Sequence, residues 1–121
     1  HPDHRALSKY VKEAAGFNCP IIYADTLMGV NFNPTIYIDI SEHIEEKLFA
    51  IMCHKSQNPE KFVNATKLLN KFRAGQCNGE LNGYAEAYSF DSVFPFSDIR
   101  SLLPPPPKTN KYYSNLSNSF L

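Results

Sequence analysis

The sequence has little of what marks the more specialised classes of protein. Its 121 residues include no tryptophan, only 5 glycines and only 3 cysteines, and 12 basic residues balance 12 acidic ones. A chain with zero net charge has no general attraction to polyanions, which argues against nucleic acid as a partner. The longest apolar run, 48–53, is far shorter than the ~20 residues that cross a bilayer. We therefore predict no membrane-spanning segment.

The cysteines Cys19, Cys53 and Cys77 are odd in number and widely, irregularly spaced. This pattern suits neither a disulfide framework nor a metal-binding Cys-x-x-Cys pair. We expect reduced, mostly buried thiols in a cytoplasmic protein. With 43% hydrophobic residues, the chain has the length and composition of one globular domain.

Hydrophobic periodicity predicts a mixture of helices and strands. The predicted helices cover 3–15, 41–57, 60–77 and, in a short piece, 97–103. The predicted strands cover 20–24, 35–40 and 84–90. Asp39 and Glu42 are expected to form a capping box for the second helix. Four consecutive prolines and many Asn and Ser residues predict that 104–121 is an extended, partly disordered tail.

The segment His1-Pro2-Asp3-His4 is the densest group of ligand and proton-transfer side chains in the chain. Pro2 suits the first position of a helix, and Asp3 suits its positive first turn. Two imidazoles three residues apart can point to the same side, so that one binds a metal while the other faces a substrate. Asp3 can hydrogen-bond the His1 ring and favour its protonated form. Ordinary helix-start residues are the alternative, and the helical pattern disfavours a copper-binding histidine brace at His1.

Three other residues each have a functional and a structural interpretation. Arg5 can grip a phosphate or carboxylate of a substrate, or it can solvate the face of its helix. Asp25 follows a predicted strand, where α/β proteins bind ligands, but Asp is also a common loop residue there. His54 near the end of a predicted helix complements the negative end of the helix dipole, so we do not interpret it as a ligand.

Several stretches together resemble one enzyme family. His1-Pro2-Asp3-His4-Arg5-Ala6 leading into a helix resembles the second conserved motif of the PIG-L/LmbE family of zinc-dependent N-deacetylases. The likeness continues in the family's order at 23–26, 34–41, 47–57 and 83–88. It covers roughly residues 1–103 and implies the C-terminal half of a Rossmann-like, three-layer α/β/α domain, followed by the tail 104–121.

The resemblance also implies an activity, the removal of acetyl groups from N-acetylglucosamine-type amides by zinc-activated water. His4 would be a zinc ligand, His1 would stabilise the oxyanion or protonate the leaving amine, and Asp3 would orient His1. Arg5, Gln57 and Tyr84 would contact the substrate, an acetylated amino sugar. Gln57 can equally cap its helix, and Tyr84 can equally be a core or rim residue.

One part of the family's pattern is absent from this sequence. The upstream HPDD-type motif, which in the family supplies two zinc ligands and the general base, does not occur here. We therefore expect the chain to be a fragment of a deacetylase that is inactive alone. A non-catalytic α/β binding or interaction module is the alternative function. The sequence leaves open which acetylated substrate is used and whether the protein is a homo-oligomer.

Overall fold

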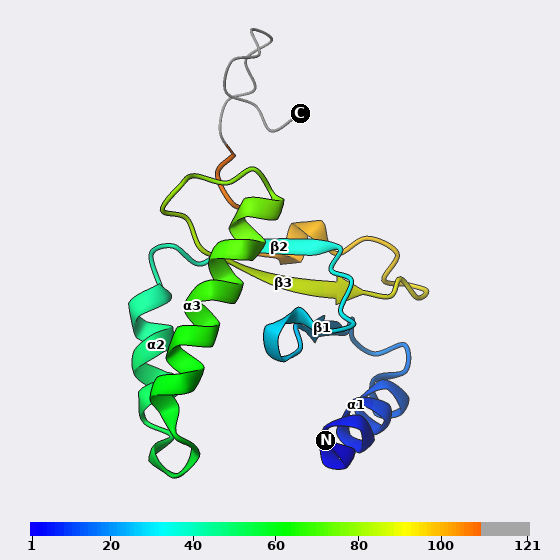
Figure 1. Cartoon of the computed structure of the whole chain (residues 1–121). Coiled ribbons are helices and arrows are strands. Elements are labelled where there is room, and N and C mark those ends of the chain that lie inside the picture. The colour runs from blue at the N-terminus through cyan, green and yellow to red at the C-terminus, as the bar shows by residue number, and fades with distance from the viewer. Residues whose placement is uncertain (110–121) are drawn as a thin grey trace, which may run out of the picture.

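The computed structural model describes residues 1–109 (Figure 1). In chain order its helices and strands are α1 (Pro2–Ala15), β1 (Ile22–Ala24), β2 (Ile36–Asp39), α2 (Ile44–Met52), α3 (Pro59–Gln76) and β3 (Ala85–Phe90). Three short 3₁₀ turns lie between or after them, at Leu27–Gly29, Lys55–Gln57 and Arg100–Leu102. The described chain is thus of mixed α/β class, as the sequence predicts.

The strands form one sheet in the order β1-β3-β2, and β3 is antiparallel to both of its neighbours. Tyr88 of β3 is level with Ala24 of β1 and with Ile36 of β2. A Rossmann-like domain is built on parallel strands. No parallel pair occurs within residues 1–109, so this part of the chain does not display the arrangement that the resemblance implies.

The core lies between the sheet and the helical pair α2 and α3, which run side by side (Figure 1). α3 packs on β3 and β2, and α2 packs on α3. The buried apolar residues are mostly small or aliphatic: Ala15, Ile38, Ile44, Leu48, Ala74, Ala85, Ala87 and Ile99. Small alanines on α3 and β3 let the helix lie close to the strand.

The boundaries of α2 differ from those predicted. The capping box is wrong, because the Asp39 carboxylate accepts hydrogen bonds from the Ser41 amide (2.9 Å) and hydroxyl (2.6 Å) in a turn before the helix. α2 begins only at Ile44, and it ends at Met52 rather than at 57. A residue before proline avoids the right-handed helical region, and Asn58 accordingly has a φ of 52° ahead of Pro59.

α1 lies beside the edge strand β1, apart from α2 and α3 (Figure 1). Pro2 occupies its first turn and His1 is its N-cap, as expected for this sequence. Ala15 is the only buried residue of the helix, and the side chains of Leu7 and Tyr10 are each 64% exposed. The amphipathic pattern thus located the helix correctly, but residues 1–109 do not cover its apolar face.

The structure also departs from what the sequence predicts for the cysteines and for the segment after β3. The cysteines are free, but they are not mostly buried, since Cys19 and Cys53 are exposed and Cys77 is half-buried. The short helix expected over 97–103 is reduced to one 3₁₀ turn.

The first part of the predicted tail packs on the body, because the Asp39 amide donates to the Pro105 carbonyl (3.2 Å). The rest of the predicted tail, 110–121, lies outside the described residues. Within residues 1–109, every helix is too short or too polar to cross a bilayer.

Candidate functional site

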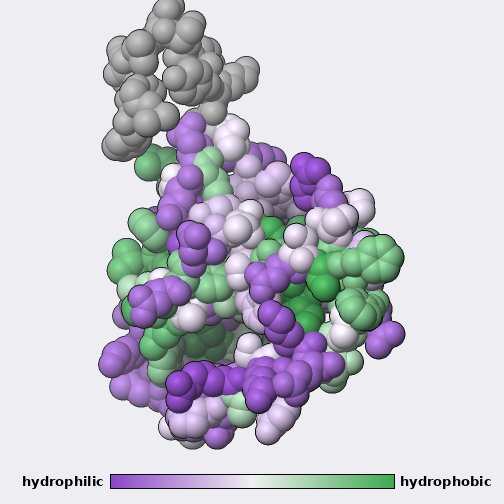
Figure 2. Space-filling model, turned by 90° about the vertical axis from the view of Figure 1, so that its right-hand side faces the viewer, coloured by the Kyte–Doolittle hydropathy of each residue, from purple (hydrophilic) through white to green (hydrophobic). Residues whose placement is uncertain are grey.

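An open groove of about 1150 Å³ separates α1 from the end of β1. Its α1 wall is wholly polar and consists of His1, His4, Arg5, Ser8, Lys9 and Lys12. Residues at this spacing lie on one face of a helix, and the opposite face carries the exposed apolar residues of α1. The other wall comes from β1, the loop after it and the end of β3, and includes Tyr23, Asp25, Thr26, Phe32 and Asp91. Figure 2, seen from the side on which α1 lies, shows hydrophilic surface gathered along the lower part of this face.

Three side chains of the segment 1–4, here called the histidine motif, lie close together at the start of α1: those of His1, Asp3 and His4. His1 Nδ1 is 3.5 Å from Asp3 Oδ2, and the ring centroids of His1 and His4 are 5.8 Å apart. The same Nδ1 is also 3.3 Å from the Asp3 amide nitrogen. Unprotonated Nδ1 accepts from this N–H, whereas protonated Nδ1 can donate to the carboxylate. Asp3 therefore offers a partner to both protonation states of His1.

The described residues alone do not make up a zinc site. A catalytic zinc is held by three protein ligands and one water. His4 lines the groove and can supply one imidazole, but residues 1–109 contain no group of three or more His, Cys, Asp or Glu side chains able to hold a metal. A complete zinc site at His4 therefore requires ligands from outside this part of the chain.

The structure does not bring Gln57 and Tyr84 to the groove. Gln57 ends the 3₁₀ turn between α2 and α3, where its amide donates to the Ser56 hydroxyl (3.4 Å). Tyr84 lines a separate small pocket near Asp39, and the Lys71 ammonium lies 5.6 Å from the centre of its ring. Of the predicted substrate-binding residues, only Arg5 lies on the groove with the histidines.

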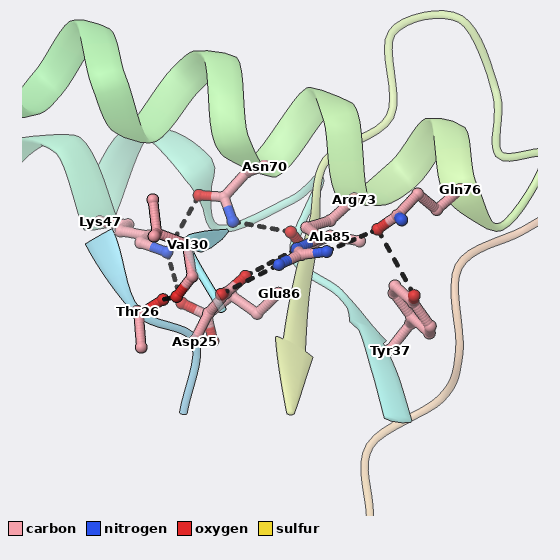
Figure 3. A network of polar contacts seen from close by, with 10 residues as sticks. All are labelled: Asp25, Thr26, Val30, Tyr37, Lys47, Asn70, Arg73, Gln76, Ala85 and Glu86. Atoms are coloured by element: carbon pink, nitrogen blue, oxygen red, sulfur yellow. Dashed lines mark hydrogen bonds and ion pairs between the residues drawn. The ribbon is translucent and has the colours of Figure 1, made fainter. Parts of the chain in front are cut away.

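Asp25 lies on the groove but is held by a buried arginine. The Arg73 guanidinium donates to both carboxylate oxygens of Asp25 at 2.7 and 3.0 Å, and the two side chains are only 3% and 13% exposed (Figure 3). Arg73 also donates to Gln76 (2.7 Å) and lies 6.0 Å from the ring centre of Phe32. Gly29 packs so close that an added Cβ would lie 2.6 Å from the guanidinium. Arg73 thus fixes the loop that forms one wall of the groove.

A second polar cluster joins α2, α3 and β3 (Figure 3). The Lys47 ammonium lies 2.6 Å from Glu86 and 3.0 Å from Asn70, and the Asn70 amide donates to the Ala85 carbonyl at 2.7 Å. Burial alone would raise the pKa of Glu86, but hydrogen bonds from Lys47 and from the Tyr88 hydroxyl, with the Lys47 charge, hold that pKa below its ordinary value. Burial and the contact with Glu86 raise the pKa of Tyr88.

Neither cluster was predicted as a site, although Asp25, Lys47 and Glu86 belong to stretches that resemble the deacetylase family. Sequence reasoning missed Arg73 and gave Lys47 and Glu86 no role of their own. The available signal was weak: Asn70, Arg73 and Ala74 share one face of α3, so two polar side chains accompany a small apolar one.

The chain was compared with family models, with curated proteins and with solved structures. None of them matches it. Any functional assignment therefore depends on the groove and on the residues that line it, together with the motif resemblance.

Replacing Lys47 with glutamine is expected to lower the free energy of unfolding by about 1–3 kcal/mol at pH 7, because Glu86 loses its charged partner. The folded-state pKa of Glu86 lies below its ordinary value of 4.5, so the pair stabilises the fold fully above pH 4.5 and loses this effect as the pH falls through the folded-state value. Urea unfolding between pH 3 and 7 measures the difference, which should shrink at the acidic end.

The matched control is Lys9→Gln, which removes an exposed lysine 3.8 Å from Glu13. Such surface pairs contribute roughly 0–1 kcal/mol. A pH-independent loss in Lys47→Gln, or an equal loss in both variants, would show that the Glu86 pair does not stabilise the fold in this way.

Proposed function

We propose that this chain contributes part of the active site of a zinc-dependent N-deacetylase that acts on an acetylated amino sugar. The observation that carries the proposal is the histidine motif at the wall of the groove, where His1, paired with Asp3, lies 5.8 Å from His4 by ring centroids. An acid beside a candidate metal ligand, both facing a groove of ligand size, is the arrangement that amide hydrolysis needs.

Each of the three residues has a role in this proposal. His1 carries the proton that the leaving amine takes up, and Asp3 orients its ring and supports the protonated state. His4 contributes an imidazole to the metal. Zinc, when bound, would supply polarisation of the acetyl carbonyl and activation of water. Arg5, which lines the same wall, would contact the substrate.

The proposal extends to the architecture. Residues 1–103 would form part of a Rossmann-like, three-layer α/β/α domain in a cytoplasmic protein. Two features support this: β1 pairs with β3 on one side only, and the apolar face of α1 is exposed. Further strands added beside β1 would give α1 a surface on which to pack its apolar face.

Zinc titration of the chain under chelator competition is expected to show no tight one-to-one site, because His4 is one ligand where three are needed. Weak binding through His1 and His4 should disappear in His4→Ala and persist in His43→Ala, which removes an exposed histidine outside the groove. Nanomolar one-to-one binding would mean that the ligand set is wrong.

The activity itself is tested by extending the expressed protein upstream of His1 in the encoding gene. The proposal expects an HPDD-type motif there, stoichiometric zinc and deacetylation of an N-acetylglucosamine derivative. Absence of the motif together with absence of activity would favour a non-catalytic binding or interaction module.

A further inference from the structure

The first residues of the proline-rich tail lie on a surface that the proposed active site does not use. The segment 104–109, here called the tail segment, lies beside β2 and the end of α3 (Figure 1). We propose that the surface beneath it is a docking site for a proline-rich, basic segment of a partner protein, and that the tail segment occupies this site when no partner is bound. The surface shares no lining residue with the groove, so the docking site does not depend on the deacetylase proposal.

Backbone contacts near both ends hold the tail segment against the body. The Asp39 amide donates to the Pro105 carbonyl at 3.2 Å, and Thr109 pairs with Gly79 in an isolated antiparallel bridge. β2 lies at the edge of the sheet in the described part of the chain, so the Asp39 amide has its partner in the tail segment rather than in a further strand. Peptides commonly bind proteins by adding an extended segment to such an edge. The tail segment thus shows how an extended chain is held here.

The pocket beneath Pro107 has the character of a site for proline-rich peptides. Pro107 is buried, and it lines this pocket together with the aromatic ring of Tyr84 and with Ala74 near the end of α3. Aromatic-lined grooves take polyproline II segments, because consecutive prolines lose little conformational entropy when they bind. The four prolines 104–107 favour this extended form, and no helix or strand occurs over them. An added Cβ at Gly79 would lie 2.8 Å from the Ala74 carbonyl oxygen, so only glycine lets the loop close one side of the pocket.

Acidic residues around the pocket favour a basic residue next to the buried proline. Lys108 lines the pocket together with Asp39 and Glu80. Burial would raise the pKa of Asp39, but hydrogen bonds from Ser41 and the positive charge of Lys108 hold that pKa below its ordinary value. A partner segment in which a lysine or arginine follows the proline would bring the same charge to Asp39.

The tail segment is held weakly enough to be displaced. Pro107 is the only buried residue within 104–109. Opening of a segment with so little buried surface requires much less free energy than global unfolding. The tail segment nevertheless competes with any free peptide at an effective concentration of about millimolar, because it is part of the same chain. A free peptide should therefore bind well only after the contacts of the tail segment have been weakened.

The test uses the full 121-residue chain and a fluorescent peptide with the sequence of residues 103–109, and binding is measured by fluorescence anisotropy. Pro107→Asp places a carboxylate in the buried position, so the tail segment should leave the site and the peptide should bind at least about tenfold more tightly than to the unaltered chain. The matched control, Pro106→Asp, adds the same charge at an exposed proline and should bind the peptide no better than the unaltered chain. A peptide with aspartate in place of its fourth proline should bind none of the three proteins.

Lys108→Glu is a second variant, which reverses an exposed charge, leaves the buried proline in place and should raise the affinity for the peptide by a smaller factor. Equal affinities in Pro107→Asp and Pro106→Asp would overturn the proposal. So would a lack of saturable binding to Pro107→Asp and Lys108→Glu when their circular dichroism spectra match that of the unaltered chain. A dimer of the unaltered chain in analytical ultracentrifugation that is lost in Pro107→Asp would assign the surface to the tail of a second copy, and would overturn its assignment to a partner protein.

Discussion

Replacing Arg73 with alanine is expected to lower the free energy of unfolding by about 3–5 kcal/mol, the usual loss when one partner of a buried ion pair is removed. Arg73 is 3% exposed and donates to both oxygens of Asp25, so the truncation leaves a carboxylate at 13% exposure with no counter-charge. The ion pair also links α3 to the loop that follows β1, and no other ion pair joins these two segments within residues 1–109. Urea unfolding followed by circular dichroism measures the loss.

Two controls separate burial from charge. Arg100→Ala removes an exposed arginine paired with Asp98 and should leave the unfolding free energy nearly unchanged, because solvent screens such surface pairs. Combining Arg73→Met with Asp25→Asn removes both charges, and the combined loss should be smaller than the sum of the single losses because the two sites are coupled. A loss under about 1 kcal/mol in Arg73→Ala would show that the pair does not hold the loop after β1 to α3.

In the upstream-extended protein, His1→Ala and His4→Ala are expected to separate the two histidines. His4→Ala should lose zinc and activity together, since it removes a direct ligand. His1→Ala should keep zinc and slow turnover by roughly 10²–10⁴-fold, the usual contribution of a positioned acid. Elemental analysis of the metal and kcat on an N-acetylglucosamine derivative give the two readouts.

Asp3→Asn should fall between the two histidine variants in turnover and retain its zinc, because it changes the partner of protonated His1 and not the metal. His43→Ala is the matched control, with metal and turnover unchanged. Zinc lost in His1→Ala but kept in His4→Ala would reverse the assigned roles. Full activity in both variants would make the motif structural.

The sequence predicted the elements with the strongest local signals. α1 and α3 carry a helical period together with a proline in the first turn, and β3 alternates between faces, so each was located within about two residues. The end of α2 was missed because no proline or glycine occurs in 53–57, so the first stop signal in the sequence is Asn58-Pro59, whereas the backbone leaves the helix after Met52. Periodicity reports which residues suit a helix, and not where the next element forces it to end.

Which face of α3 is buried was not predictable in the same way. The apolar residues Leu68 and Phe72 of α3 are 62% and 56% exposed, whereas the polar residues Asn70 and Arg73 are buried. The partner of Arg73 is Asp25, which is remote in sequence and belongs to a loop with no helical or strand pattern. A buried charge depends on a tertiary partner, which local sequence does not reveal.

In the candidate site, too, the contacts between sequence neighbours were predictable and the tertiary ones were not. His1, Asp3 and His4 are neighbours in one helical turn, so their proximity follows from the sequence alone. Arg5 follows from the same turn. Gln57 and Tyr84 were placed with them only by resemblance, and in the described residues their positions depend on the α2–α3 turn and on the start of β3.

The weak attachment of α1 affects the two halves of the groove differently. Opening of a helix with so little buried surface requires much less free energy than global unfolding, so α1 belongs to the least protected part of the chain towards amide hydrogen exchange. When α1 moves as a rigid rod, the distances among His1, Asp3 and His4 are unchanged because all three belong to the same turn. The distance from His4 to the wall fixed by Arg73 changes when α1 moves, because that wall belongs to a different part of the chain. The groove therefore combines a group of His1, Asp3 and His4 of constant shape with an opening whose width can vary.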